Sequence, residues 1–131
     1  MYTYKIKEII RVVDGDTVDV LIDLGFGIAK KERVRIAGID APETRTKDSK
    51  EKSFGIESKT WLTDCLETVK LLTIKTEKEG KYGRILGWLY IDDSDASVNE
   101  IMINEGYAWE YNRDKKEKDF DLLLSKRAIR L

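Results

Sequence analysis

The chain has 131 residues, of which 41% are apolar and 37% are charged, and its formal net charge is −1. This length fits one domain with a single core, which we expect to span residues 1–131. A net charge so close to zero excludes a global basic field, so a polyanionic partner would have to bind a local patch.

The chain contains no histidine and a single cysteine, Cys65. These counts exclude an intramolecular disulfide, imidazole metal ligands and histidine general bases. A metal ion would therefore be held by oxygen, which favours calcium or magnesium. No apolar run reaches the roughly 18 residues that span a bilayer, so we expect no membrane association. The N-terminus has no signal-peptide core, which indicates a cytoplasmic protein if Met1 is the native start and a secreted one if a leader was removed.

The first half of the chain predicts three strands and a loop. Residues 4–13 and 17–24 are expected to be strands joined by the turn Asp14-Gly15-Asp16. Gly25-Phe26-Gly27 ends the second strand, and residues 31–39 form the third, with Gly38 suited to a bulge or bend. In this third strand the alternation places Arg33 and Arg35 on the same face. The polar residues 45–52 are expected to form a loop.

The second half predicts helices and two further strands. Residues 53–66 have the apolar spacing of a helix, residues 69–76 and 85–91 that of strands, and residues 78–81 that of a charged turn. A short helix over 98–105 ends at Gly106, and a final helix covers 116–131. Five short strands with about three α-helices predict an α+β fold, a closed five-stranded barrel of the OB type. Such barrels commonly bind single-stranded nucleic acid.

Two aspartates lie at the ends of predicted strands, where loops gather at one rim of a barrel. Asp16 precedes the second strand and Asp40 closes the third. Carboxylates that meet there, with a main-chain carbonyl near Ala41, would form an incomplete shell for a calcium ion. Taken alone, Asp-Gly-Asp is far more often a turn than a metal site, so both interpretations stay open at this step.

A carboxylate and two arginines nearby have the chemistry of phosphate transfer. Glu43 is either a proton acceptor for an attacking water or a solvated loop residue. Arg35 and Arg84 are either phosphate ligands or members of surface ion pairs. Two further groups are equally open: Lys81 and Tyr82 contact a nucleotide or merely form a turn, and Trp109 is a core residue or a stacking platform.

Three motifs in this order resemble those of the staphylococcal nuclease (thermonuclease) family: Asp14-Gly15-Asp16-Thr17, the run from Arg35 through Asp40-Ala41-Pro42-Glu43-Thr44, and Lys81-Tyr82-Gly83-Arg84. The resemblance covers nearly the whole chain, from about Tyr4 to the final helix. It implies an SNase-like OB-fold domain and a calcium-dependent nuclease that hydrolyses DNA and RNA. The products expected of this family carry a 3′-phosphate and a 5′-hydroxyl.

The resemblance also implies roles for particular residues. By matched position, the calcium ligands are Asp16, Asp40 and the main-chain carbonyl of Ala41, the catalytic residues are Arg35, Glu43 and Arg84, and the nucleotide contacts are Lys81 and Tyr82. The alternative is a non-catalytic OB-fold module that binds single-stranded nucleic acid. The presence of both aspartates, both arginines and the glutamate favours the enzyme. We expect a monomer with little sequence specificity.

Overall fold

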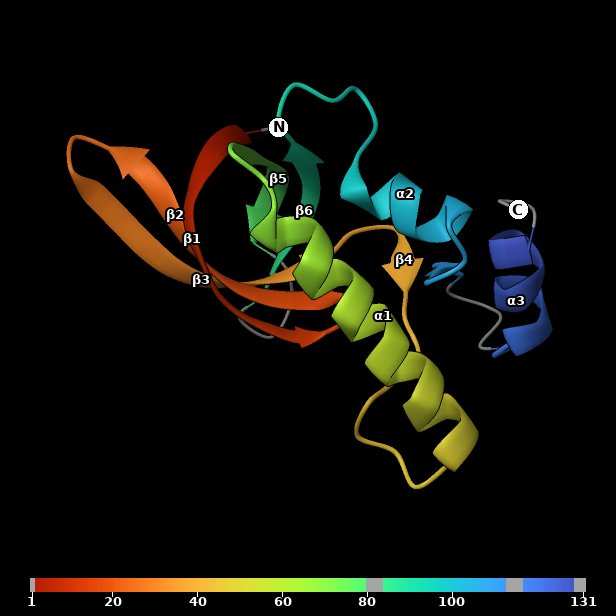
Figure 1. The fold of residues 1–131 in the computed structure, drawn as a ribbon. Coiled ribbons are helices and arrows are strands. Elements are labelled where there is room, and N and C mark those ends of the chain that lie inside the picture. The colour runs from red at the N-terminus through yellow and green to blue at the C-terminus, as the bar shows by residue number, and fades with distance from the viewer. Residues whose placement is uncertain (1, 80–83, 113–116, 129–131) are drawn as a thin grey trace.

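A closed barrel forms the centre of the computed structural model, which describes residues 2–79, 84–112 and 117–128. Its five strands are β1 (Tyr2–Asp14), β2 (Thr17–Gly25), β3 (Ile28–Ile36), β5 (Leu72–Glu79) and β6 (Arg84–Ile91). They follow one another around the barrel in the order β1-β2-β3-β6-β5, and β1 pairs with β5 to close it (Figure 1). Only the β3–β6 pair is parallel among the pairings of the described strands. The predicted five-stranded OB-type barrel is confirmed.

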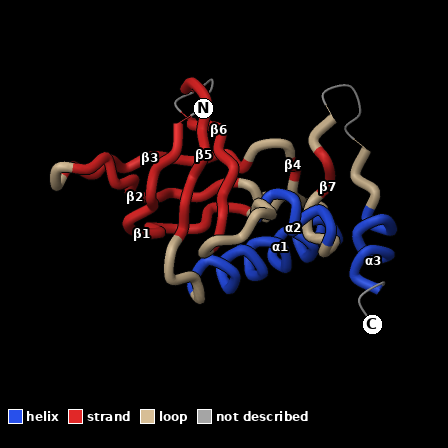
Figure 2. The backbone as a smooth tube through the Cα atoms, turned by 90° about the horizontal axis from the view of Figure 1, so that it is seen from above, coloured by secondary structure: helices blue, strands red, loops and turns tan. Residues whose placement is uncertain are grey.

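The described residues contain three helices, as predicted, and a second small sheet. The helices are α1 (Ser49–Glu67), α2 (Val98–Asn104) and α3 (Phe120–Ala128), and the small sheet pairs β4 (Ile39–Asp40) with β7 (Trp109–Glu110). Figures 1 and 2 show the helices gathered toward one side of the molecule, while the β2–β3 hairpin projects from the other side. Among the described residues, no helix combines the length and the apolar character needed to cross a bilayer.

The barrel core follows from strand alternation. In β2 the even-numbered residues Val18, Val20 and Ile22 are 0–3% exposed and point inward, as the pattern predicts. Val34 of β3 and Ile74 of β5 are also fully buried. The inward row of one strand therefore packs against the inward rows of the others.

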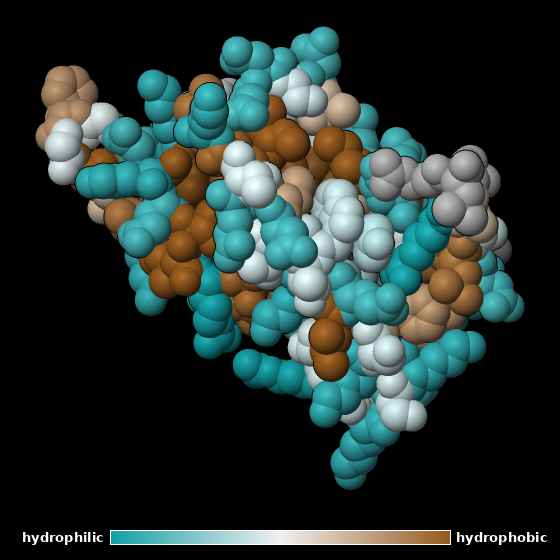
Figure 3. Space-filling view, in the orientation of Figure 1, coloured by the Kyte–Doolittle hydropathy of each residue, from teal (hydrophilic) through white to brown (hydrophobic). Residues whose placement is uncertain are grey.

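The projecting hairpin carries apolar side chains at its tip. Phe26 is fully exposed and adopts a left-handed backbone conformation (φ 55°) between two glycines that also have positive φ. Leu24 and Ile28, on either side of the turn, are 41% and 58% exposed. Figure 3 shows this apolar tip at the left edge of the molecule.

The third predicted strand, 31–39, is in fact two strands separated by a turn. β3 ends at Ile36, and Gly38 turns the chain with a φ of 76°, so β4 leaves the barrel to pair with β7. The buried amide of Asn99 fixes this exit: its Nδ2 donates to the carbonyls of Ala37 (2.7 Å) and Gly87 (3.2 Å). A buried side chain from α2 thus determines where β4 begins.

Several predicted boundaries were wrong by three or four residues. Helix α1 begins at Ser49 and not at residue 53, because Asp48 caps it by accepting the N–H groups of Lys50 and Glu51. The polar residues that suggested a loop over 45–52 include the first turn of this helix. Strand β5 covers 72–79, so residues 78 and 79 extend the strand where a turn was predicted.

The final helix also begins later than predicted. Of the expected range 116–131, the described helix α3 covers Phe120–Ala128, and residues 116 and 129–131 lie outside the described residues. Leu123 is fully buried, whereas the next residue, Leu124, is 47% exposed.

Candidate active site

Asp16 lies at the start of β2, directly after the β1–β2 turn. Its carboxylate accepts the N–H of Ala41 (3.0 Å) and the hydroxyl of Thr17 (3.0 Å). Its own carbonyl accepts the N–H of Ile36, at the end of β3 (2.8 Å). Asp16 therefore ties the start of β2 to the end of β3 and to Ala41, which are 20 and 25 residues away in the sequence.

Arg35 lies opposite Thr17 in the β2–β3 register, which brings it beside Asp16. One guanidinium nitrogen, Nη1, is 3.6 Å from Asp16 Oδ2, and the other, Nη2, is 3.6 Å from Asp40 Oδ1. Nη1 also donates to the carbonyl of Ile36 (3.1 Å). The Arg35 side chain is only 17% exposed, so a single guanidinium group is held between the two predicted metal ligands.

Asp40 is the outermost of these groups. Its side chain is 52% exposed, which leaves it accessible from solvent. Partial burial raises the pKa of Asp40, the nearby Asp16 carboxylate raises it further, and Arg35 opposes both. The two carboxylates therefore repel each other across a guanidinium that partly neutralises them, an arrangement that favours a bound cation.

Glu43 lies three residues after Asp40 in the chain, and the buried carboxylate of Glu51 holds its backbone. The Glu43 N–H donates to Glu51 Oε2 (3.2 Å), and Glu51, which is 4% exposed, lies in the first turn of α1. Lys118 Nζ contacts the two Glu51 carboxylate oxygens at 2.9 and 2.8 Å. This hydrogen-bonded ion pair raises the pKa of Lys118, to which the charges of Glu43 and Asp40 also contribute. Lys118 is thus a cation close to the predicted acidic residues.

Two glycines allow α1 to approach the turns that carry the site. A Cβ atom at Gly55 would collide with the carbonyl carbon and oxygen of Glu43, and one at Gly15 would lie 2.9 Å from the Cβ of Ser58 and 3.0 Å from that of Ala41. Both positions therefore require the absence of a side chain. The close contact of α1 with these turns fixes Asp16 and Glu43 relative to the same helix.

Four of the predicted site residues lie together, a fifth lies close by in the chain, and the other three are described only in part or not at all. The structure places Asp16, Arg35, Asp40 and Ala41 in direct or shared contact, with Glu43 on the adjoining turn. Lys81 and Tyr82 fall outside the described residues. For Arg84 the structure describes the backbone, which pairs with that of Arg33 at the start of β6.

Sequence reasoning missed the residues that position this site. Asp48 and Glu51 have the spacing of a helix-capping pair, which could have located the start of α1. Glu51 does not complete that pair but reaches the Glu43 backbone and Lys118 instead. Lys118 is 67 residues from Glu51 in the sequence, and no local pattern indicates their contact. A further missed contact is the hydrogen bond from the Thr44 hydroxyl to Asp14.

The donor atoms at this corner suit a hard cation that keeps much of its water. Across residues 2–79, 84–112 and 117–128, no three Asp, Glu, His or Cys side chains gather in a way that could hold a metal ion by themselves. Asp16 and Asp40 nevertheless each place a carboxylate oxygen 3.6 Å from the Arg35 guanidinium, and oxygens of this kind match calcium or magnesium. Main-chain oxygen and water would have to complete the shell, and the Ala41 carbonyl remains the predicted third ligand.

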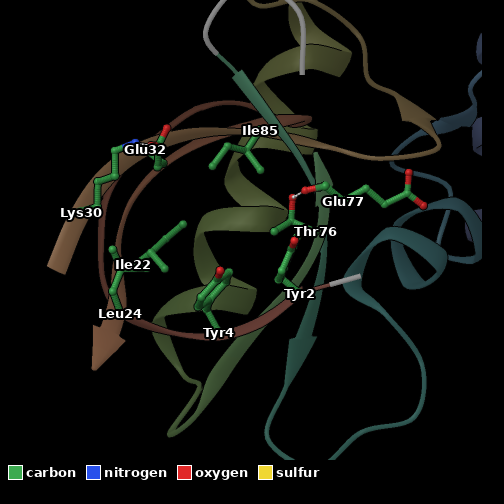
Figure 4. Close-up of a pocket in the computed structure, with 9 residues that line it drawn as sticks. All are labelled: Tyr2, Tyr4, Ile22, Leu24, Lys30, Glu32, Thr76, Glu77 and Ile85. Carbon is green, nitrogen blue, oxygen red and sulfur yellow. Dashed lines mark hydrogen bonds and ion pairs between the residues drawn. The ribbon is translucent and has the colours of Figure 1, made fainter. Parts of the chain in front are cut away.

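A cavity of about 250 Å³ lies at a different place, in the mouth of the barrel (Figure 4). Its lining includes Tyr2 and Tyr4 of β1, Ile22 and Leu24 of β2, Thr76 of β5 and Ile85 of β6. None of the predicted site residues that the structure describes lines this cavity. The candidate site lies elsewhere, where the Asp16 and Arg35 side chains are 15% and 17% exposed and that of Asp40 is 52% exposed.

Comparison with known proteins gives a family model and several relatives whose names include the word nuclease or endonuclease. The model of the family described as "Staphylococcal nuclease homologue" matches residues 33–128. An uncharacterized endonuclease of Escherichia coli is 34% identical over 108 residues, covering 80% of this chain and 60% of that protein. A micrococcal nuclease of Shigella flexneri is 36% identical over 120 residues (86% and 62%), and an endonuclease of Bacillus subtilis is 32% identical over 100 residues (75% and 44%). The chain thus spans about 60% of the length of the first two relatives.

Proposed function

Because the chain belongs to the staphylococcal nuclease homologue family, we propose that it hydrolyses phosphodiester bonds in DNA and RNA with little sequence specificity. The observation that carries the proposal is the meeting of Asp16, Arg35 and Asp40 at one corner of the barrel, with Glu43 on the next turn. Carboxylates that attract a cation, beside a guanidinium that binds an anion, are the groups that phosphodiester hydrolysis requires.

The cofactor that we propose is Ca²⁺, held by Asp16, Asp40 and the main-chain carbonyl of Ala41. When bound, the ion would supply positive charge next to the phosphate oxygens. Two protein carboxylates leave room for water and for a substrate oxygen in a shell of six to eight ligands. Asp16 is oriented by its hydrogen bond from the Ala41 backbone, which also brings residue 41 beside it.

Arg35 would bind the non-bridging phosphate oxygens. Its planar guanidinium matches the geometry of a phosphate, and its partial burial makes its hydrogen bonds stronger than those of a fully solvated arginine. Negative charge builds up at phosphorus during attack, so a cation fixed beforehand lowers the barrier without reorganising. We propose Arg84 as the second such cation, since β6 starts beside the β3 residue Arg33. Lys81 and Tyr82 remain the proposed nucleotide contacts.

Glu43 would accept the proton of the attacking water. Its side chain is not engaged in the Asp16–Arg35–Asp40 contacts, while its backbone is anchored to Glu51. Attack of the water oxygen at phosphorus breaks the bond to the 5′-oxygen of the next nucleotide. That oxygen takes up a proton and becomes a 5′-hydroxyl, and the phosphate stays on the 3′-oxygen.

The test is cleavage of single-stranded DNA and of RNA in calcium and in chelator, compared among wild type, Glu43→Gln and Arg84→Ala. We expect calcium-dependent cleavage by the wild type and losses of about 100-fold or more in both variants. The matched control is Glu67→Gln, because Glu67 is exposed at the far end of α1. Cleavage by the wild type without calcium, or full activity in both variants, would refute the mechanism.

The products distinguish the proposed bond cleavage from its alternative. Fragments with 5′-hydroxyl ends accept a label from polynucleotide kinase without prior dephosphorylation, and this is the expected result. A requirement for dephosphorylation would mean that the other phosphoester bond is cut. Binding of single-stranded DNA with no cleavage in any buffer would support the non-catalytic module instead.

A further inference from the structure

The outer face of β3 carries a row of basic side chains that begins at the candidate site. Alternation places Lys31, Arg33 and Arg35 on one face of the strand, opposite the buried residues Val34 and Ile36. Successive members of such a row are about 6.6 Å apart. That separation is close to the distance between successive phosphates of an extended nucleic-acid strand.

Arg33 is held in place by a buried partner. Its Nε and Nη2 groups donate to the two carboxylate oxygens of Asp19 at 2.7 and 3.1 Å, and Asp19 lies directly opposite it on β2. The Asp19 side chain is 12% exposed, whereas that of Arg33 is 47% exposed. Two of the five guanidinium N–H donors are used in this pair, which leaves three that can bind an anion from solvent.

Further positive charge surrounds the same carboxylate. Arg11 of β1 pairs with Asp19 across the sheet, and both Arg11 and Lys31 are exposed. Arg33, Arg11 and Lys31 all lower the pKa of Asp19, the hydrogen-bonded Arg33 most strongly. Three cations thus face one carboxylate, on a protein whose net charge is −1. This is a local positive patch of the kind that the overall charge requires if the partner is a polyanion.

We propose that a set of three basic side chains binds the phosphates of the nucleic-acid strand on one side of the bond that is cut. The set, here called the β3 basic row, consists of Lys31 and Arg33 of β3 and the adjacent Arg11 of β1. The proposal rests on the proposed function, because the row continues from Arg35 along β3 toward the projecting hairpin (Figure 1). Contacts to phosphates alone carry no sequence information, in agreement with a nonspecific substrate. The row also means that a substrate several nucleotides long binds better than a dinucleotide.

The β3 basic row is tested by binding, independently of cleavage. Fluorescence anisotropy with a labelled oligothymidylate of twelve nucleotides, in chelator and over a range of salt, compares wild type with Lys31→Gln/Arg33→Gln. We expect weaker binding in the variant and a logarithmic salt slope less steep by about 1.4, which is about 0.7 for each lost phosphate contact. The matched control is Lys70→Gln/Lys126→Gln, which removes the same charge from the α1–β5 turn and from α3. The control should keep the slope of the wild type.

Replacing Arg33 leaves the buried Asp19 without its partner, so a second variant guards against misfolding. Arg11→Gln/Lys31→Gln changes two exposed side chains only and should reduce the slope by a similar amount. The proposal for the β3 basic row is wrong if the wild type and both row variants have equal salt slopes, or if the wild type does not bind the oligonucleotide. If the slopes differ as predicted but the wild type never cleaves, the proposed catalysis is wrong and the proposal for the β3 basic row stands. If the wild type cleaves and the salt slopes are equal, the proposed catalysis stands and only the proposal for the β3 basic row is wrong.

Discussion

The buried carboxylate of Glu51 should matter for the site although it is not one of the proposed catalytic residues. It is a positioning residue, since it accepts the backbone N–H of Glu43 and pairs with Lys118. Replacing Glu51 by alanine removes both contacts, whereas glutamine keeps an oxygen for the Glu43 N–H and removes only the charge. The two variants therefore separate anchoring of the turn from electrostatic stabilisation.

The exposure of the two partners sets the size of the effect. Exposed ion pairs contribute about 0.2–1 kcal/mol, and loss of one partner from a fully buried pair costs about 3–5 kcal/mol. The Glu51 side chain is 5% exposed and that of Lys118 is 45% exposed, so this pair lies between the two limits. We expect Glu51→Ala to lower the free energy of unfolding by about 2 kcal/mol and Glu51→Gln by about 1 kcal/mol. These losses correspond to melting temperatures lower by about 8 °C and about 4 °C.

Thermal unfolding and steady-state cleavage measured together test this reasoning. If Glu51 anchors the Glu43 turn, Glu51→Ala should lose about tenfold or more in kcat with a smaller change in KM, and Glu51→Gln should keep most of kcat. Glu67→Ala, at the exposed end of α1, should behave as wild type in both assays. The reasoning is wrong if Glu51→Ala melts within about 1 °C of the wild type, as a surface substitution would. Equal kcat values in all variants would contradict the anchoring role.

Three further predictions concern the groups around the site. Arg33 holds the pKa of Asp19 below its ordinary value of 3.8, so the stability from this pair is complete above pH 3.8 and is lost as the pH falls through the lower folded value. Urea unfolding should show the deficit of Asp19→Asn shrinking in acid, and a constant deficit would refute this. Glu51 raises the pKa of Lys118 above 10.5, so the deficit of Lys118→Met should be present below that pH and vanish as the pH rises through the folded value. Gly55→Ala should lower the free energy of unfolding by about 1–3 kcal/mol, because the added Cβ would collide with the carbonyls of Pro42 and Glu43. Thermal melting measures this loss, and a melting curve identical to that of the wild type would show that the backbone at Glu43 shifts to accommodate the methyl group.

The barrel could be predicted because its strands obey a local rule. Alternating apolar residues in β2 and the turn formers on both sides of it identify the strand, and Val18, Val20 and Ile22 are buried as that rule requires. The end of β3 could not be predicted from the same rule. The alternation fails at Ile39 and the bend expected at Gly38 is present, but the strand ends before it, at Ile36, where Asn99 and Gly87 bind the backbone at Ala37. These partners are fifty or more residues away in the chain, so the strand end is a tertiary effect.

Some residues of the candidate site could likewise be predicted from the sequence, and others could not. Asp16 and Arg35 lie close together because the β2–β3 hairpin sets Arg35 opposite Thr17, and Asp40 is only five residues farther along the chain, so their proximity could be inferred from the chain. Glu51 and Lys118 could not be found in that way. Their contact depends on the pairing of β4 with β7 and on the hydrogen bond from the Trp109 indole to the carbonyl of Asp119, which places residue 118 near the start of α1.

The positions of the reactive groups therefore depend on residues that have no reactive chemistry of their own. Glu43 sits on an exposed turn, and a turn of that kind has many conformations of similar energy. Two features restrict it here: α1 packs against its carbonyl at Gly55, and Glu51 of the same helix holds its N–H. A rigid helix thus fixes both polar groups of the Glu43 backbone, and the side chain projects from a backbone that is held at two points. Loss of either restraint should affect kcat before it affects the affinity for nucleic acid, because the proposed phosphate contacts lie on strands of the barrel and the proposed proton acceptor lies on the segment that Glu51 and Gly55 hold.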